Sequence, residues 1–180
     1  MRRDRRCRFT LLAVAVTLAF PLLVVAEEAQ APAASAAQAF DRLKSLAGEW
    51  IDVDGSMGMK GQVAVTYRVS GAGSVVIETQ FAGAPHEMVN VFYRDGETVA
   101  ATHYCAAGNQ PRFRSTAITA NVIQLGFDGG TNLDPAKDTH IHDARIEFVS
   151  ADEIRTDWAG WFGGKADTEH VVKFHLVRKK

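Results

Sequence analysis

The chain has 180 residues, of which 20 are Lys or Arg and 21 are Asp or Glu, and 47% are hydrophobic. This length fits one domain with an adequate core. A formal charge of −1 gives no electrostatic basis for nucleic-acid binding, and 23% charged residues are too many for several membrane spans. The hydrophobic content also excludes a disordered chain.

Residues 1–26 have the pattern of a secretory signal peptide. Five arginines precede an uncharged apolar run over 9–25, and Val24 and Ala26 occupy the positions where signal peptidase requires small residues. The alternative is an uncleaved anchor, but a run of 17 residues is at the short limit for crossing a bilayer. We therefore expect a periplasmic or secreted protein with no stable membrane insertion after cleavage.

Cleavage would change both the charge and the cysteine content of the chain. Loss of five arginines and one aspartate leaves 15 basic and 20 acidic residues, so the mature formal charge would be −5. Cys7 would leave with the signal peptide, and Cys105 would remain without a partner for an internal disulfide.

The rest of the chain is predicted to be a leader, a helix and many strands. Residues 27–38 are rich in alanine and are predicted as a flexible leader, followed by a barrel domain over 39–180. Phe40, Leu43 and Leu46 recur at helical spacing, which predicts a short amphipathic helix over 39–47 that stops at Gly48.

Beyond Gly48 the residues typical of turns recur at short intervals, and β-branched and aromatic residues lie between them. Short connections without intervening helices favour a closed meander. We predict an all-β fold, a roughly ten-stranded antiparallel up-and-down β-barrel with a short N-terminal helix. The expected strands are 49–54, 61–70, 74–82, 86–94, 97–105, 112–119, 121–127, 139–149, 153–162 and 168–178.

Alternation of side chains predicts which face of a strand points into the barrel. Four strands alternate clearly, whereas those over 86–94 and 112–119 do not. The predicted inward rows are Val63, Val65, Tyr67 and Val69; Val75, Ile77, Thr79 and Phe81; His140, His142, Ala144, Ile146 and Phe148; and His170, Val172, Phe174, Leu176 and Arg178.

Gly48-Glu49-Trp50 at the start of the first strand resembles the G-x-W element of lipocalins and the wider calycin barrels. In those proteins the Trp closes one end of the barrel and a basic residue on the last strand packs over its ring; the resemblance implies that Arg178 does so here. Ten strands resemble fatty-acid-binding-protein-like and nitrobindin-like barrels more than lipocalins. The stretch from Phe40 through Trp50 to the segment 103–112 is also similar to a family of exported bacterial calycin-like proteins, which implies no particular activity.

Histidines and a cysteine are candidate metal ligands. His103 and Cys105 share one strand face, which we expect to point into the barrel, and His140 and His142 share another. If the pairs converge, His103, His140 and His142 offer nitrogen ligands suited to Zn or Cu. The alternative is that His103 is a hydrogen-bonded core residue, Cys105 a buried thiol, and the other two lie at the barrel mouth. The nitrobindin resemblance separately implies a haem ligand near the C-terminus, for which His170 is the candidate.

The segment 108–114 is a second candidate binding element. Asn109 and Gln110 offer amides, and Arg112 and Arg114 share a face that would clamp a carboxylate or phosphate if it pointed inward. If it points outward, these arginines are an ordinary solvated face and the Gly-Asn-Gln-Pro tetrad is a turn. Trp158 suits a barrel wall or a pocket equally.

The expected function is therefore the binding of a small, partly apolar ligand, with or without an acidic head group, inside the barrel. The ligand-binding candidates are His103, Cys105, Asn109, Gln110, Arg112, Arg114 and Trp158. The alternative from another class is a metal- or haem-dependent enzyme or sensor, and a third is a packed barrel whose outer surface binds a protein. No nucleophile elbow, P-loop, HExxH or dinucleotide motif is present, so no catalytic residue is predicted. The cofactor and the oligomeric state stay undetermined at this stage.

Overall fold

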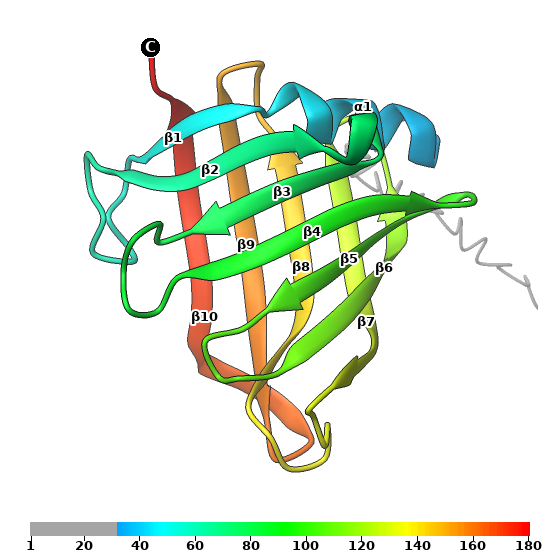
Figure 1. The fold of residues 1–180 in the computed structure, drawn as a ribbon, viewed down its shortest axis with the longest axis vertical. Helices are drawn as coiled ribbons and strands as arrows, with labels where there is room; N and C mark the ends of the chain where they lie inside the picture. Colours follow the sequence, from blue (N-terminus) through cyan, green and yellow to red (C-terminus); the bar gives the residue numbers. More distant parts are fainter. Residues whose placement is uncertain (1–31) are drawn as a thin grey trace, which may run out of the picture. The chain divides into compact units, whose positions relative to one another are not determined.

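One helix is followed by ten antiparallel strands, and pairing of the first strand with the last closes the sheet into a barrel (Figure 1). The computed structural model describes residues 32–180, apart from the side chain of His170. The elements are α1 Ala36–Ser45, β1 Gly48–Asp52, β2 Val63–Ser70, the short 3-10 helix η1 Gly71–Gly73, β3 Val75–Gln80, β4 Met88–Asp95, β5 Thr98–Tyr104, β6 Gln110–Ile118, β7 Val122–Thr131, β8 His140–Phe148, β9 Glu153–Phe162 and β10 Lys165–Arg178. The predicted ten-stranded antiparallel barrel with a short N-terminal helix is confirmed.

The predicted signal peptide and the first part of the predicted leader lie outside the described residues. The helix begins at Ala36 instead of residue 39, because Ser35 and Gln38 form a capping box that satisfies the first free amide groups. Ahead of it, Ala33 pairs with Thr119 in a β-bridge, so the residues from Pro32 onward are attached to the barrel. None of the described helices is long and apolar enough to cross a membrane.

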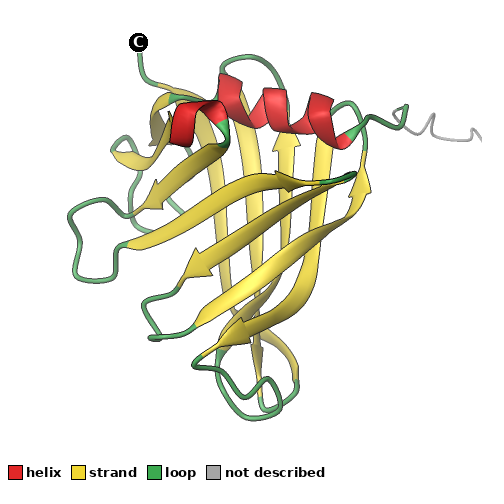
Figure 2. Ribbon diagram, turned by 45° about the vertical axis from the view of Figure 1, so that its right-hand side comes forward, coloured by secondary structure: helices red, strands yellow, loops and turns green. Residues whose placement is uncertain are grey.

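Helix α1 lies across one end of the barrel and closes it (Figure 2). Its buried face, which includes Phe40 and Leu43, joins the barrel core, and its polar face is left to solvent. Below this capped end, large apolar side chains such as Phe92, Ile146 and Leu176 are completely buried. The opposite end has no helix and is formed by loops.

Trp50 and Arg178 hold the capped end together. Trp50 is fully buried, and its Nε1 donates to the Leu46 carbonyl at 2.8 Å. The Arg178 guanidinium lies 4.5 Å from the centre of the Trp50 ring, as the G-x-W pattern predicted. Gly48 has a φ of +133°, a conformation that favours glycine, and a Cβ there would lie 3.2 Å from Arg178 Nη1, so Arg178 would have to move slightly to admit a larger residue.

Arg178 also joins three segments by hydrogen bonds. It donates to the carbonyls of Ser45 and Ala47 after the helix, and to the Ala151 carbonyl and the Asp152 carboxylate in the β8–β9 turn. We expect Arg178→Ala to lower the free energy of unfolding by about 2–4 kcal/mol, because it removes charged hydrogen bonds and the cation–π contact together. Urea denaturation measures this loss. Arg68→Ala, on an exposed position of β2, is the control, and equal losses in the two variants would contradict the assigned role.

The predicted faces are confirmed in β10 and in the part of β8 from Ala144 onward, and they are wrong in β3. A bulge between Ile141 and Asp143 breaks the predicted alternation in β8, so Ile141 is buried and His142 is only half-buried. Ala144, Ile146 and Phe148 of β8 and Phe174 and Leu176 of β10 are buried, as expected. In β3 the buried residues are Val76, Glu78 and Gln80, whereas Val75, Ile77 and Thr79 lie on the outer face. Phe81 is buried as predicted, but it follows the strand with a φ of +54°, so its burial does not report the alternation of β3. Val69 in β2 was also predicted inward and is 39% exposed.

Candidate functional site

Four polar side chains form a continuous row on the inner face of neighbouring strands β2, β3, β4 and β5. The row begins at Tyr67, which pairs with Glu78 on the next strand. Glu78 pairs with Asn90, and Asn90 pairs with His103. Each of the four is at most 3% exposed. We call these residues the polar row; their direct pairing across adjacent strands brings their side chains together inside the barrel.

Hydrogen bonds within the row define the state of the His103 ring. His103 Nδ1 lies 2.7 Å from Asn90 Oδ1, and a carbonyl oxygen only accepts. Nδ1 therefore carries the proton, and the neutral ring keeps its lone pair on Nε2. Beside the row, Gln80 Nε2 donates to Glu78 Oε1 at 2.8 Å.

Burial shifts the pKa values of Glu78 and His103 in opposite directions. It raises the pKa of Glu78 to about 7, although the amides of Gln80 and Asn90 beside it act to lower the value. It lowers the pKa of His103 to about 4. Burial and the neighbouring Glu78 charge raise the pKa of Tyr67. Near neutral pH, His103 and Tyr67 are uncharged and Glu78 is at the midpoint of its titration.

Trp158 of β9 reaches across the interior to the row. Its ring stacks on His103, with 5.9 Å between ring centres and 27° between planes. It also contacts Phe92 and Phe113, and only 1% of it is exposed. Trp158, a predicted ligand contact, therefore packs in the middle of the barrel against the polar row.

Several buried polar atoms in this region have no hydrogen-bond partner among the described residues. They are Tyr67 Oη, Glu78 Oε2, Asn90 Nδ2, His103 Nε2, Thr156 Oγ1 and Trp158 Nε1. Buried polar groups in proteins are almost always satisfied, and leaving one unpaired costs about 1–3 kcal/mol. Such a concentration indicates a place that water or another hydrogen-bonding molecule completes.

A mainly apolar pocket of about 290 Å³ lies at the uncapped end of the barrel. Its walls include Met57, Met88, Cys105, His140, Ile141 and Val172. Inward-facing residues of a strand recur every second position. Asn90 is therefore the next inward position below Met88 on β4, and His103 of β5 lies two residues before Cys105, which directly follows that strand. The polar row lies directly beneath this pocket.

Cys105 is one of the residues that line this pocket. This cysteine is half-buried and packs against the core, as the sequence predicted for an inward residue near a strand end. Burial raises the pKa of its thiol, although a hydrogen bond from the Ala107 amide acts to lower it. A thiol in this state is weakly reactive, which fits a wall residue better than a nucleophile.

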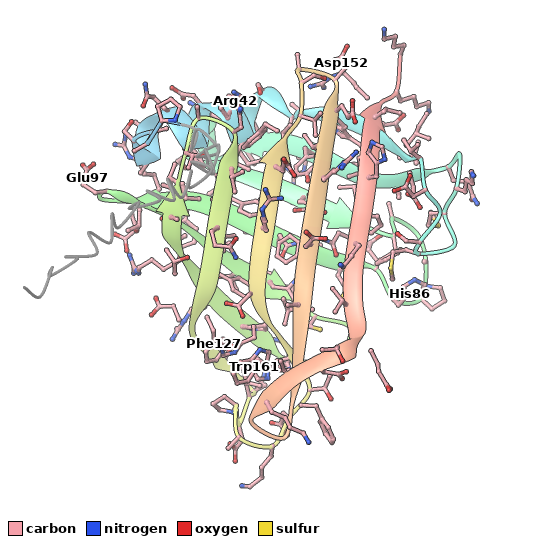
Figure 3. All side chains as sticks on the ribbon, turned by 180° about the vertical axis from the view of Figure 1, so that it is seen from behind. Arg42, His86, Glu97, Phe127, Asp152 and Trp161 are labelled. Carbon is pink, nitrogen blue, oxygen red and sulfur yellow. The ribbon has the colours of Figure 1, made fainter. Side chains whose placement is uncertain are left out.

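His140 and His142 form a separate cluster at the uncapped end. His140 Nδ1 lies 2.9 Å from the Asp138 carbonyl, and its Nε2 lies 3.2 Å from His142 Nδ1. His142 stacks on Phe127 and on Trp161, with ring centres 4.7 Å and 3.8 Å away. Figure 3 shows Phe127 and Trp161 close together at the end of the barrel remote from Arg42. Burial lowers the pKa of His142, the neighbouring Asp143 acts to raise it, and His140 lowers it further.

The three predicted metal ligands are thus divided between two clusters. His103 is bonded to Asn90, whereas His140 and His142 are bonded to each other. Across the described residues, no group of three or more His, Cys, Asp or Glu side chains is arranged to hold a metal ion. The haem candidate, His170, lies in β10, and its side chain is outside the described part of the structure. Haem ligation by this residue stays a prediction.

Of the two orientations left open for Arg112 and Arg114, the structure has the outward one, in which neither arginine can clamp a ligand inside the barrel. Arg112 is exposed, and Arg114 pairs on the outer surface with Asp95 at 2.8 Å and with Asp128 at 3.3 Å. The residues of β6 that point inward are Pro111 and Phe113. The solvated-face alternative is therefore the one that the fold adopts.

The side chains of Asn109 and Gln110 form hydrogen bonds that connect the loops of the uncapped end. Asn109 is buried, and its Nδ2 donates to the Thr139 carbonyl, which ties the β5–β6 turn to the β7–β8 loop. Gln110 Oε1 accepts from Thr131 and from Asn132. These contacts agree with the turn alternative, since neither amide reaches into the polar row.

The sequence prediction missed Tyr67, Glu78, Asn90 and Thr156 as functional candidates. The misassigned face of β3 placed Glu78 outside the barrel, and β4 had no assigned face at all. One signal was available: Glu78 and Asn90 each interrupt an otherwise apolar stretch of a central strand. A polar residue in such a position either faces solvent or is buried with polar partners, and alternation alone does not distinguish the two cases.

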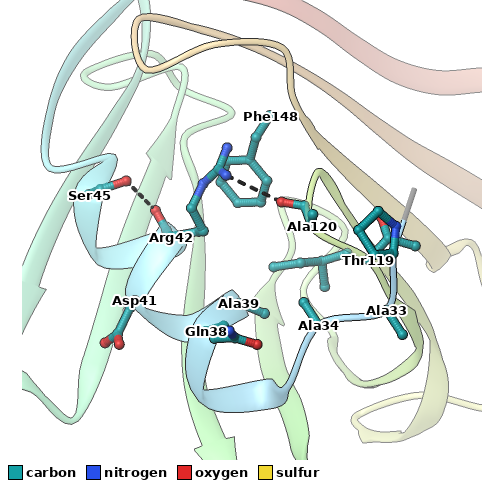
Figure 4. Close-up of a pocket in the computed structure, with 12 residues that line it drawn as sticks. Ala33, Ala34, Gln38, Ala39, Asp41, Arg42, Ser45, Thr119, Ala120 and Phe148 are labelled. Atoms are coloured by element: carbon teal, nitrogen blue, oxygen red, sulfur yellow. Dashed lines mark hydrogen bonds between the residues drawn. The ribbon is translucent and has the colours of Figure 1, made fainter.

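A second hollow, of about 530 Å³, lies outside the barrel between the start of α1 and the β6–β7 turn (Figure 4). Arg42 lies in it, 4.6 Å from the centre of the Phe148 ring, and donates to the Ala120 carbonyl. Its buried polar atoms are paired in this way, so it lacks the unsatisfied groups that characterise the interior.

The fold and the site together define a closed ten-stranded antiparallel β-barrel, capped by a helix at one end, with a polar row beneath an apolar pocket at the other. No protein-family model matches the chain, and comparison with curated proteins finds no similar sequence.

Proposed function

We propose that this protein is an exported barrel of the calycin type that takes a small, partly apolar molecule into its uncapped end. The observation that carries the proposal is the apolar pocket with unsatisfied polar atoms directly beneath it. Apolar walls with a few convergent polar groups are the usual composition of a small-molecule site. The Trp50–Arg178 closure at the other end supports the calycin comparison.

The same observations restrict the ligand. Packing of Trp158, Phe92 and Phe113 fills the middle of the barrel, so the space for a ligand is the pocket above the polar row. The pocket volume of about 290 Å³ is at the lower end for ligand sites, which favours a small molecule over a long lipid. An acidic head group would meet Glu78 and no inward arginine.

Binding of a neutral fluorescent probe tests the proposal. We expect N-phenyl-1-naphthylamine to bind at one saturable site and to gain fluorescence as it leaves water. Val172→Trp, which fills the pocket from an inward position of β10, is expected to weaken this binding about tenfold or more, because the probe loses most of its buried apolar contact.

Val177→Trp is the matched control, since Val177 lies on the other face of the same strand. Equal probe binding by the two tryptophan variants would place the probe elsewhere, and absence of saturable binding to the native chain would contradict the proposal. Native mass spectrometry of the freshly purified protein gives an independent measurement of any small molecule retained.

A further inference from the structure

The barrel interior contains a buried acidic side chain, Glu78, and no basic side chain in the described part of the chain pairs with it. Glu78 is completely buried, and its carboxylate has no Lys or Arg partner among the described contacts. No Lys or Arg is among the buried residues that the structure describes. His103 does not compensate, because its Nδ1 proton is directed to Asn90 and the ring is neutral. Burying Glu78 as a carboxylate is costly unless it takes up a proton or a positively charged group joins it.

Most of the unpaired buried polar atoms in and beside the polar row are hydrogen-bond acceptors without a donor among the residues described. When Glu78 is ionised its Oε2 is an acceptor, His103 Nε2 is an acceptor in the tautomer deduced above, and the hydroxyls of Tyr67 and Thr156 can also accept. Only Asn90 Nδ2 and Trp158 Nε1 must donate. A molecule with several N–H donors fits this set, whereas a carboxylate would add acceptors beside Glu78.

We propose that the ligand is a small apolar primary amine whose ammonium group is bound by the Glu78 carboxylate. This assignment rests on the proposed function and adds the chemical class of the ligand. The ammonium carries three N–H donors, so it can donate to Glu78 Oε2 and to the hydroxyl of Tyr67, which pairs with Glu78 on the neighbouring strand. A desolvated ion pair is favourable only with such additional hydrogen bonds.

The pocket above the row suits the rest of such a molecule. Met57, Met88 and Val172 offer apolar contacts to a short hydrocarbon or ring. Glu169 is the one charged residue among the described residues that line the pocket. A cation approaching the mouth is therefore attracted at the rim and again at Glu78, whereas an anion meets two carboxylates.

Three probes of nearly the same shape test the class: 2-phenylethylamine, 2-phenylethanol and phenylacetate, titrated calorimetrically into the full chain. At about pH 7.5, where the amine is charged, we expect it to bind about tenfold or more tightly than the alcohol, and phenylacetate to bind weakest. Glu78→Gln is expected to reduce the amine affinity to that of the alcohol. Glu97→Gln, in the exposed β4–β5 turn, is expected to leave both unchanged.

The outcomes separate this inference from the proposed function. If the alcohol or the acid binds native protein as tightly as the amine, the class is wrong, while probe binding in the pocket keeps the proposed function. The same conclusion follows if folded Glu78→Gln keeps the preference for the amine. If neither the amine nor N-phenyl-1-naphthylamine binds, both proposals fail. The comparison of the amine, the alcohol and the acid on native protein tests the ligand class even if Glu78→Gln does not fold.

Discussion

Trp158→Ala is expected to destabilise the barrel by about 3–5 kcal/mol, the range for removing a buried aromatic side chain. The ring is 1% exposed and contacts Phe92, His103 and Phe113, so its loss opens a cavity that β-strands of a closed sheet cannot readily collapse to fill. Urea denaturation followed by far-ultraviolet circular dichroism measures the change. Trp158→Phe should lose less, because it keeps an aromatic ring in the same space.

Trp161→Ala is the matched control for this prediction. Trp161 lies three residues further along β9 and is half-exposed, with stacking on His142 as its main contact. Its removal is expected to cost about 0.5–1.5 kcal/mol, the value of an aromatic pair. A Trp158→Ala variant no less stable than Trp161→Ala would show that the interior is not packed around Trp158.

The second large effect is on the pH dependence of stability. Glu78 has a pKa of about 7 in the folded protein, above its ordinary value of 4.5, so the folded state holds a proton that the unfolded state has released. Its contribution is present below pH 4.5 and is lost as the pH rises through 7. His103 has a folded pKa of about 4, below its ordinary 6.5, so its contribution is present above pH 6.5 and is lost as the pH falls through 4.

These two contributions oppose each other between pH 4.5 and 6.5. Each changes the free energy of unfolding by about 1.4 kcal/mol per pH unit, with opposite sign, so they nearly cancel in the native protein. Relative to the native protein, Glu78→Gln is expected to gain stability as the pH rises across this window. His103→Gln is expected to lose stability over the same rise. Other groups that titrate, including Tyr67 at higher pH, are common to all three proteins and drop out of the differences.

Urea titrations at several pH values measure these differences directly. Glu97→Gln serves as the control for loss of an exposed carboxylate. Differences that do not change with pH in either variant would show that Glu78 and His103 are not desolvated as the structure indicates. Slopes of the same sign would contradict the assignment of one buried acid and one buried base to the polar row.

The fold was predictable because its signals are local. Turn residues separate the strands at short intervals, and the observed strands lie within a few residues of the expected ones. The closure by Arg178 was also predictable, since the G-x-W element and the last strand are paired in a barrel of this kind: Trp50 lies directly opposite Arg178. His103 was expected inward from its strand and is completely buried.

The candidate site was predictable only in part. The alternation in β3 was assigned from apolar Val75 and Ile77, but these lie outside, where they pair with Tyr93 and Val91 of β4. Apolar residues on the outer face can pack against each other across neighbouring strands, so an outer face can have the same alternation of apolar residues as an inner face. The direction of Arg112 and Arg114 was likewise open, because a row of arginines has the same spacing on either face of a strand.

By itself, then, the sequence determined the number and order of the strands, because these depend on local spacing, and it predicted the inward position of His103. The closing Trp50–Arg178 pair was implied by the resemblance of Gly48-Glu49-Trp50 to the calycin G-x-W element. Only the tertiary structure decided that Glu78, Asn90 and His103 form one row beneath a pocket, and that the arginines lie outside it. Those relations depend on strand register, and a shift of one residue exchanges the two faces of a strand. No property of a strand taken alone specifies which partners it meets across the barrel.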